Sequence, residues 1–317
     1  MSRYLILYAC AIIAVLYLII IYIIVVFNEI KYKNIEKPSI DLVNWMYKLP
    51  ESKKNLKIYD LFIPGSHNSG SYEYNNYLGT IINTPNIPYP FTYKNIFSYI
   101  KRWSINQKLS VFEQLKSGIR YIRFKCIYHN NEMYSEHTLI GVRMSIILKD
   151  ILTFITNTKE VVIIHFSNIQ CTNKEYNIFK KYVENMFKDT LEINFKIKSL
   201  KELIESNKRS IIIFNKIYSP YCKNCTNFKD SLSKIDEYIT NKPSSEYGNI
   251  WSIELSETIL PKTIIYNPFG SVLNRAVINN NIVIDWLKTK RKFNITISDK
   301  VEDIAPFIIN LNLLEEV

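Results

Sequence analysis

Two of the four histidines, His67 and His137, each follow a segment that we expect to be a strand. Breaking a phosphodiester requires a base for the attacking hydroxyl, an acid for the leaving oxygen, and positive charge for the phosphoryl oxygens. Histidine titrates near neutral pH and can serve as acid or base. Arg123 and Lys125 occupy alternate positions of one expected strand, so their side chains point to the same face. This set of residues predicts acid–base cleavage of a phosphodiester.

The same residues also have structural explanations. A histidine after a strand can be a hydrogen-bonded loop residue, and Arg123 and Lys125 can form a solvated strand face. His165 lies inside an apolar run, where we expect a core histidine, and His129 lies in an expected turn. The residue types and their spacing therefore leave both explanations open.

Strand-like and helix-like segments alternate along the chain after residue 41, and they determine where these side chains lie. We expect strands at residues 57–63, 120–126, 133–137, 161–166, 210–214 and 293–297. We expect helices at residues 111–117, 145–156, 282–288 and 301–311, with a break at Pro306, and another helix after the capping box of Ser199 and Glu202. This alternation favours a parallel sheet, and the glycine patterns of nucleotide-binding folds are absent. A barrel is therefore favoured, with catalytic groups at the carboxyl ends of its strands.

Composition sets the broad class. The 317 residues are 47% hydrophobic, which is enough for one large core or two small ones. A single α/β barrel of ordinary size would use nearly the whole chain. A formal net charge of +11 indicates either a solvated basic surface or an anionic partner, nucleic acid or lipid. The five cysteines form no dense disulfide framework, and we expect Cys222 and Cys225 in a surface loop. We also expect a surface loop at residues 75–95.

Residues 4–27 contain no charged side chain and are long enough to span a bilayer as a helix. We therefore predict a single-pass membrane protein, with an anchor at residues 1–27, a tether at 28–40 and a barrel domain at 41–317. The side of the membrane stays open, because flanking lysines and the Asn224 and Asn294 sequons favour opposite orientations. A membrane partner favours acidic lipid over nucleic acid as the target of the basic surface.

Several motifs resemble the phosphatidylinositol-specific phospholipase C X-domain family, especially its short X-domain-containing members. The run LFIPGSHNS ends at Ser69, EQLKSGIRY ends at Tyr121, and EVVII begins at Glu160. A weaker similarity includes Asp299. The resemblance spans about residues 41–312 and implies a distorted TIM (β/α)8 barrel that cleaves between glycerol and phosphate.

The resemblance also implies roles for individual residues. His67 would be the base on the inositol 2-hydroxyl, producing diacylglycerol and a cyclic phosphate, and His137 would protonate the diacylglycerol oxygen. A slower second step could open the cyclic phosphate with these roles exchanged. Asp299 would orient His67. Asn68 stands where animal members place a calcium-binding asparagine, and we expect it to contact substrate here.

This chain departs from the family at several positions. Arg123 and Lys125 replace the two acidic calcium ligands of animal members, whereas bacterial members have Asp and Arg there. Lys125 matches that arginine, which implies a metal-independent enzyme without a cofactor, although lysine lacks the bidentate fork of arginine. Ser167 replaces a lysine or glutamate, and Thr138 replaces the usual glycine after the second histidine. We expect Arg123 and Ser167 to contact substrate.

Two functions follow from the sequence. The first is a phosphoric diester hydrolase that acts on phosphatidylinositol-like lipids through His67, His137 and Lys125. The alternative is a catalytically weakened or inactive, membrane-tethered barrel that binds anionic lipid headgroups. A metal-dependent glycerophosphodiesterase would need a carboxylate cluster near His67, where the sequence instead offers Asn, Arg and Lys. The oligomeric state stays open.

Overall fold

A computed structural model describes most of the chain. The described residues are 2–33, 38–74, 100–221, 228–243, 246, 248–259, 263–264, 267, 270–289 and 293–314. The loop expected at residues 75–95 and the pair Cys222 and Cys225 lie outside these residues.

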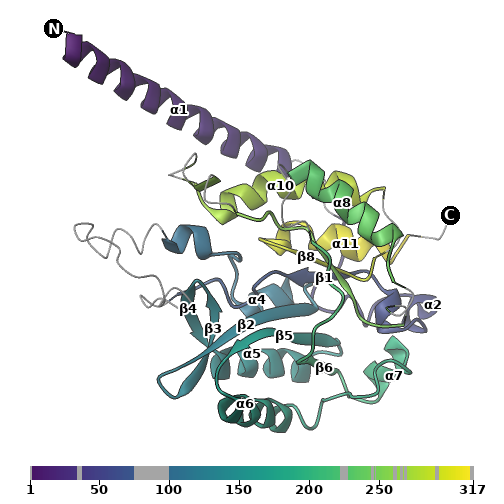
Figure 1. Cartoon of the computed structure of the whole chain (residues 1–317). Coiled ribbons are helices and arrows are strands. Elements are labelled where there is room, and N and C mark those ends of the chain that lie inside the picture. Colours follow the sequence, from purple (N-terminus) through teal and green to yellow (C-terminus); the bar gives the residue numbers. More distant parts are fainter. Residues whose placement is uncertain are drawn as a thin grey trace.

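The centre of the fold is a curved parallel sheet with the strand order β6–β5–β2–β1–β8–β7 (Figure 1). Its strands are β1 (Ile63–Ser66), β2 (Tyr121–His129), β5 (Val162–Gln170), β6 (Ser210–Ile213), β7 (Ser252–Glu254) and β8 (Ile295–Ser298). The second half of β2 also pairs with an antiparallel hairpin, formed by β3 (Glu132–His137) and β4 (Leu139–Arg143). His137 therefore reaches the site from a hairpin rather than from a parallel strand.

The barrel is closed irregularly between β6 and β7. In the part of the chain that the structure describes, no ladder joins these two strands. Instead, the backbone after β6 runs beside β7: the Ser252 N–H donates to the Tyr218 carbonyl at 3.0 Å and the Glu254 N–H to the Pro220 carbonyl at 3.2 Å. The fold is thus an α/β barrel with one distorted side.

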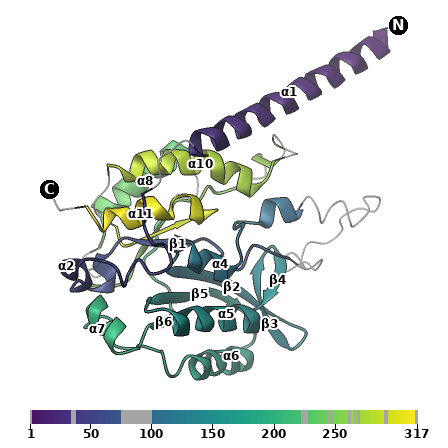
Figure 2. The ribbon, with the colours of Figure 1, turned by 180° about the vertical axis from the view of Figure 1, so that it is seen from behind.

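Helices surround this sheet (Figures 1 and 2). They are α4 (Val111–Lys116), α5 (Met144–Asn157), α6 (Asn173–Met186), α7 (Leu200–Glu205), α8 (Phe228–Thr240), α10 (Val272–Leu287) and α11 (Ala305–Leu311). Shorter pieces are α2 (Glu51–Lys54) and the 3₁₀ turns Ile58–Asp60 and Val301–Asp303, and α1 (Ser2–Lys33) precedes the barrel. The predicted capping box of Ser199 and Glu202 begins α7, because each side chain bonds the other residue's backbone N–H.

Side-chain alternation along the strands produces two apolar layers and one polar end. One layer, with Ile63, Tyr121, Ile163 and Ile211 among its members, joins the inner faces of four strands. Side chains on the opposite faces of the strands, such as Phe124 of β2, pack in a second cluster with side chains of α5 and α6. Successive residues of a strand point to opposite faces. Every second residue between the inner apolar layer and the carboxyl end of the strand therefore also points inward. This places the polar residues at the carboxyl ends of the strands around one space.

The strand expected at residues 57–63 is wrong over most of its length. Residues Ile58–Asp60 form a 3₁₀ turn, and β1 begins only at Ile63 and continues through Pro64 and Gly65. Pro64 is the second residue of β1, and its carbonyl still accepts a hydrogen bond of 3.0 Å from the Arg120 N–H. Pro306 does not break a long helix but lies in the first turn of α11, where a proline needs no N–H partner.

The N-terminal segment requires a correction. Residues 2–33 are helical as α1, so the first residues of the predicted tether at 28–40 are helix as well. A bilayer span requires about 20 consecutive apolar residues. Among the described residues, no helix combines the length and the apolarity that crossing a membrane requires. The predicted single-pass membrane location is therefore contradicted.

Candidate active site

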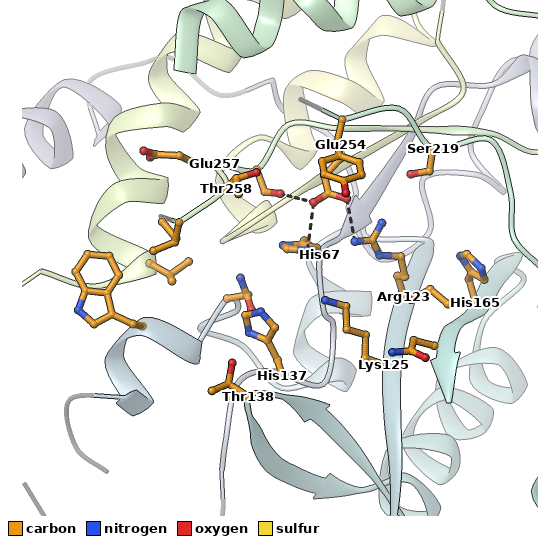
Figure 3. A pocket seen from close by; sticks show the side chains of 18 of the residues that line it. His67, Arg123, Lys125, His137, Thr138, His165, Ser219, Glu254, Glu257 and Thr258 are labelled. Atoms are coloured by element: carbon orange, nitrogen blue, oxygen red, sulfur yellow. Dashed lines mark hydrogen bonds and ion pairs between the residues drawn. The ribbon is translucent and has the colours of Figure 1, made fainter. Parts of the chain in front are cut away.

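The carboxyl ends of the parallel strands surround a cavity of about 610 Å³ (Figure 3). Residues of β2, β3, β5 and β7, together with the residue that follows β1, contribute to its wall. Among the residues predicted from the sequence, those that line it are His67, Arg123, Lys125, His137 and Ser167. Residues separated by up to 100 positions in the chain thus meet in one space.

His67 follows β1 directly and is held from several sides. Its Nδ1 lies 2.8 Å from Asp299 Oδ1, at the end of the neighbouring strand β8. Asp299 also accepts a hydrogen bond of 2.8 Å from Asn106 Nδ2. The amide of Gln107 donates to the His67 carbonyl at 2.8 Å. Because Asp299 can only accept at neutral pH, His67 Nδ1 carries the hydrogen and Nε2 is left for other partners.

His137 faces His67 across the cavity, with ring centroids 6.3 Å apart. Its Nδ1 lies 2.9 Å from the Ser104 carbonyl, which fixes the hydrogen on that nitrogen. Burial, together with the nearby charge of Lys125, lowers the pKa of His137 to about 3. The following residue, Thr138, has φ of +69°, a strained conformation for a β-branched side chain. The ring is therefore neutral and firmly oriented.

Lys125 lines the cavity and has no partner among the described residues. Its side chain extends into the space between the two imidazoles and Arg123 (Figure 3). In the described structure, no hydrogen bond or ion pair holds its ammonium group. Burial, followed by repulsion from Arg123, lowers the pKa of Lys125. Both effects would be relieved by an anion beside the ammonium group.

Arg123 is paired with Glu254, a residue that the sequence analysis missed. Arg123 Nη2 lies 2.9 Å from Glu254 Oε2, and Glu254 Oε1 lies 3.3 Å from His67 Nε2. Burial acts to raise the pKa of Glu254, but His67 and Arg123 outweigh it and lower the pKa to about 2. Glu254 belongs to β7, which has three residues and no long apolar run. The only available signal was the short alternation in WSIEL.

The remaining predicted residues lie at the edges of this group. Asn68 is buried beside His67 with φ of +44°. Ser167 lines the cavity but donates to the Phe124 carbonyl at 3.0 Å. His165 is 3% exposed, and its nitrogens contact the Tyr121 hydroxyl and the Asn215 carbonyl. His165 thus has the hydrogen-bonded surroundings expected of a core histidine, although its ring reaches the cavity wall.

The described residues contain no group of three or more His, Cys, Asp or Glu side chains arranged to hold a metal ion. The cavity instead combines two oriented imidazoles with an ammonium group that has no partner among the described residues. Such an arrangement can bind an anion and exchange protons on two sides of it.

No protein-family model matches the chain. The curated proteins homologous to it are PI-PLC X domain-containing proteins. The chain is 26% identical to mouse PI-PLC X domain-containing protein 2, over 86% of this chain and 88% of that protein. It is 32% identical to human PI-PLC X domain-containing protein 3, over 48% of this chain and 49% of that protein. A PI-PLC X-box domain-containing protein of Dictyostelium discoideum is 27% identical, and the match spans 19% of its length.

Solved structures share the fold. The phosphatidylinositol-specific phospholipase C from Listeria monocytogenes superposes with a TM-score of 0.61 at 20% identity, over 88% of this chain and all of that one (100%). The corresponding protein from Staphylococcus aureus superposes with a TM-score of 0.59 at 16% identity, over 86% of this chain and 99% of that one. The α/β barrel expected from the sequence is therefore confirmed at the level of the fold.

Proposed function

We propose that this protein is a phosphoric diester hydrolase of the phospholipase C type, acting on phosphatidylinositol-like lipids. The observation that carries the proposal is the ammonium group of Lys125, which has no partner among the described residues and lies beside two imidazoles whose ring centroids are 6.3 Å apart (Figure 3). A phosphodiester on Lys125 would have a base on one side and an acid on the other. The homologous X-domain proteins and the shared fold support the same reaction class.

In the proposed reaction, the inositol 2-hydroxyl gives its proton to Nε2 of His67, and its oxygen attacks the phosphorus. The bond between phosphorus and the glycerol oxygen breaks, and His137 protonates that oxygen. The products are diacylglycerol and a cyclic inositol phosphate. His137 must first gain a proton, and the bound phosphodiester favours this because its negative charge offsets that of Lys125. Lys125 stabilises the charge on the phosphoryl oxygens.

The test is release of water-soluble inositol phosphate from inositol-labelled phosphatidylinositol in detergent micelles, with the full chain and EDTA present. His67→Ala and His137→Ala should each lower the rate about 100-fold to 10,000-fold, the usual contribution of a general acid or base. His129→Ala is the matched control, because His129 lies outside the cavity lining. The proposal fails if the wild-type protein is as inert as His67→Ala. A strict need for added Ca²⁺ would contradict metal independence.

Headgroup binding without turnover is the alternative, and the same preparations address it. A protein that only binds headgroups in the cavity would bind phosphatidylinositol vesicles without forming any product. Because Arg123 is already neutralised by Glu254, this binding should depend on Lys125 and be lost in Lys125→Glu. Increasing salt should weaken it.

A further inference from the structure

Nε2 of His67 faces two groups of opposite hydrogen-bonding character. The amide Nδ2 of Asn68 lies 3.1 Å away. The carboxylate Oε1 of Glu254 lies 3.3 Å away (Figure 3). Nε2 is the atom that would receive the hydroxyl proton in the proposed reaction. The groups that face this atom therefore determine which of its protonation states is favoured.

The orientation of Asn68 is fixed by its neighbours. Asn106 donates through Nδ2 to Asp299, which can only accept, so Asn106 presents Oδ1 to Asn68 at 3.3 Å. Asn68 must therefore present its NH₂ group, and the same NH₂ group faces His67. The opposite orientation would place two carbonyl oxygens against each other. Asn68 thus offers a donor to Nε2, which suits the neutral ring with its lone pair exposed.

Glu254 offers the opposite character to the same atom. Its Oε2 is held by Arg123 at 2.9 Å, and its Oε1 accepts from the Ser256 hydroxyl at 2.8 Å. Because the pKa of Glu254 is lowered to about 2, it stays ionised at neutral pH. An ionised carboxylate can only accept, which suits a ring whose Nε2 carries a hydrogen.

We propose that Glu254 is the counter-ion of the His67 imidazolium, the second acidic group of the catalytic base beside Asp299. This inference rests on the proposed function. Before the reaction, the Asn68 amide donates to the lone pair of Nε2 and so favours the neutral ring. After Nε2 takes the hydroxyl proton, the new N–H donates to Glu254. In the second step, water attacks the cyclic phosphate and gives its proton to His137, while Nε2 returns its proton to the departing 2-oxygen.

Other charges around His67 determine what a test can separate. Asp299 contacts Nδ1, His137 lies across the cavity, and Lys125 and Arg123 extend from β2. Among these groups, Asp299 and Glu254 are the ones that contact the ring nitrogens as acceptors. Arg123 contacts the ring only through Glu254. A role of Glu254 toward His67 can therefore be distinguished from a role in neutralising Arg123.

The experiment compares Glu254→Gln with Arg123→Gln in the full chain. Glu254→Gln should lower kcat about 10-fold or more, with a smaller change in KM. By NMR, the His67 ring should lose its proton at a lower pH than in the wild type, because a negative charge beside Nε2 has been removed. In Arg123→Gln, the pH at which the His67 ring loses its proton should not fall, because Glu254 still faces Nε2. Glu254→Asp retains the charge and should recover part of both losses.

The outcomes separate this inference from the proposed function. If the wild-type protein is active but Glu254→Gln leaves both kcat and the His67 titration unchanged, the counter-ion role is refuted while the hydrolase stands. Equal lowering of the titration in Glu254→Gln and Arg123→Gln would also refute it, since Glu254 would then act only through the ion pair. An inert wild-type protein refutes the proposed function itself.

Discussion

At the scale of single residues, the two cations of β2, Arg123 and Lys125, differ in their partners. Arg123 is engaged with Glu254 at 2.9 Å, so its charge is largely cancelled inside the cavity. Lys125, two residues further along the same face, has no such partner in the described structure. The sequence predicted both cations on one face, but it could not show that one of them is neutralised. That fact depends on β7, which reaches β2 only in the folded barrel.

In the proposed reaction, Lys125→Met should therefore lower the rate more than Lys125→Arg. Methionine preserves much of the aliphatic stem but removes the charge that would stabilise the phosphoryl oxygens, so we expect kcat/KM to fall about 100-fold to 1,000-fold. Arginine preserves the charge and can bind phosphate through two nitrogens, so in Lys125→Arg we expect kcat/KM to fall less than about 10-fold. The measurement is the initial rate of inositol phosphate release. Wild-type rates in Lys125→Met would contradict this assignment of the phosphate site.

At the scale of elements, the sequence predicted segments with a strong internal pattern. The buried strand β5 and the helix α5 lie within a few residues of the expected positions, because continuous apolar runs and helical spacing are local signals. The short strand β7 and the 3₁₀ turn Ile58–Asp60 were missed or misassigned. Their conformations are determined by backbone partners elsewhere in the chain. Glu254 was missed for this reason, since nothing local marks it as a residue at a strand end.

The end of the barrel opposite the cavity is closed by a buried ion pair. Arg120 and Glu160 are both 0% exposed, with Arg120 Nε 2.8 Å from Glu160 Oε2. Glu160 also accepts from the backbone N–H groups of Met46 and Tyr47 at 3.1 and 2.9 Å. The two Nη atoms of Arg120 donate to the carbonyls of Leu42, Val43, Leu115 and Ile119. The pair thus attaches the segment before the barrel to the starts of β2 and β5.

Glu160→Gln should destabilise the fold by about 3–5 kcal/mol, because it leaves the Arg120 charge buried without a counter-ion. The free energy of unfolding from urea titration measures the change. Glu237→Gln is the matched control: Glu237 pairs with Lys234 on the surface of α8, and an exposed pair of this kind contributes at most about 1 kcal/mol. Equal effects of the two substitutions would show that the buried pair does not hold the barrel end.

At the scale of the whole molecule, the barrel interior changes character along its axis. Isoleucine side chains fill one end, and the opposite end collects imidazoles and charges in the cavity. The family resemblance and the strand alternation predicted this polarity from the sequence. The irregular closure by Tyr218 and Pro220 could not be predicted, because it depends on backbone hydrogen bonds to β7 rather than on a pattern of side chains. A polar end of this kind keeps neutral histidines inside the fold, and that makes stability depend on pH.

His165 provides the clearest case of this dependence. Burial, followed by repulsion from Arg123, lowers the pKa of His165 to about 4, whereas an unfolded histidine titrates near 6.5. Between these values the unfolded chain binds a proton that the folded protein excludes. Stability from this residue is therefore complete above about pH 6.5 and is lost as the pH falls toward 4, by roughly 3 kcal/mol in all. Urea unfolding at pH 7.5, 6 and 5 should show this decline, and His165→Gln should reduce it, whereas His129→Gln should leave it unchanged. An unfolding free energy that stays constant over this range would mean that the folded protein accommodates the charged ring.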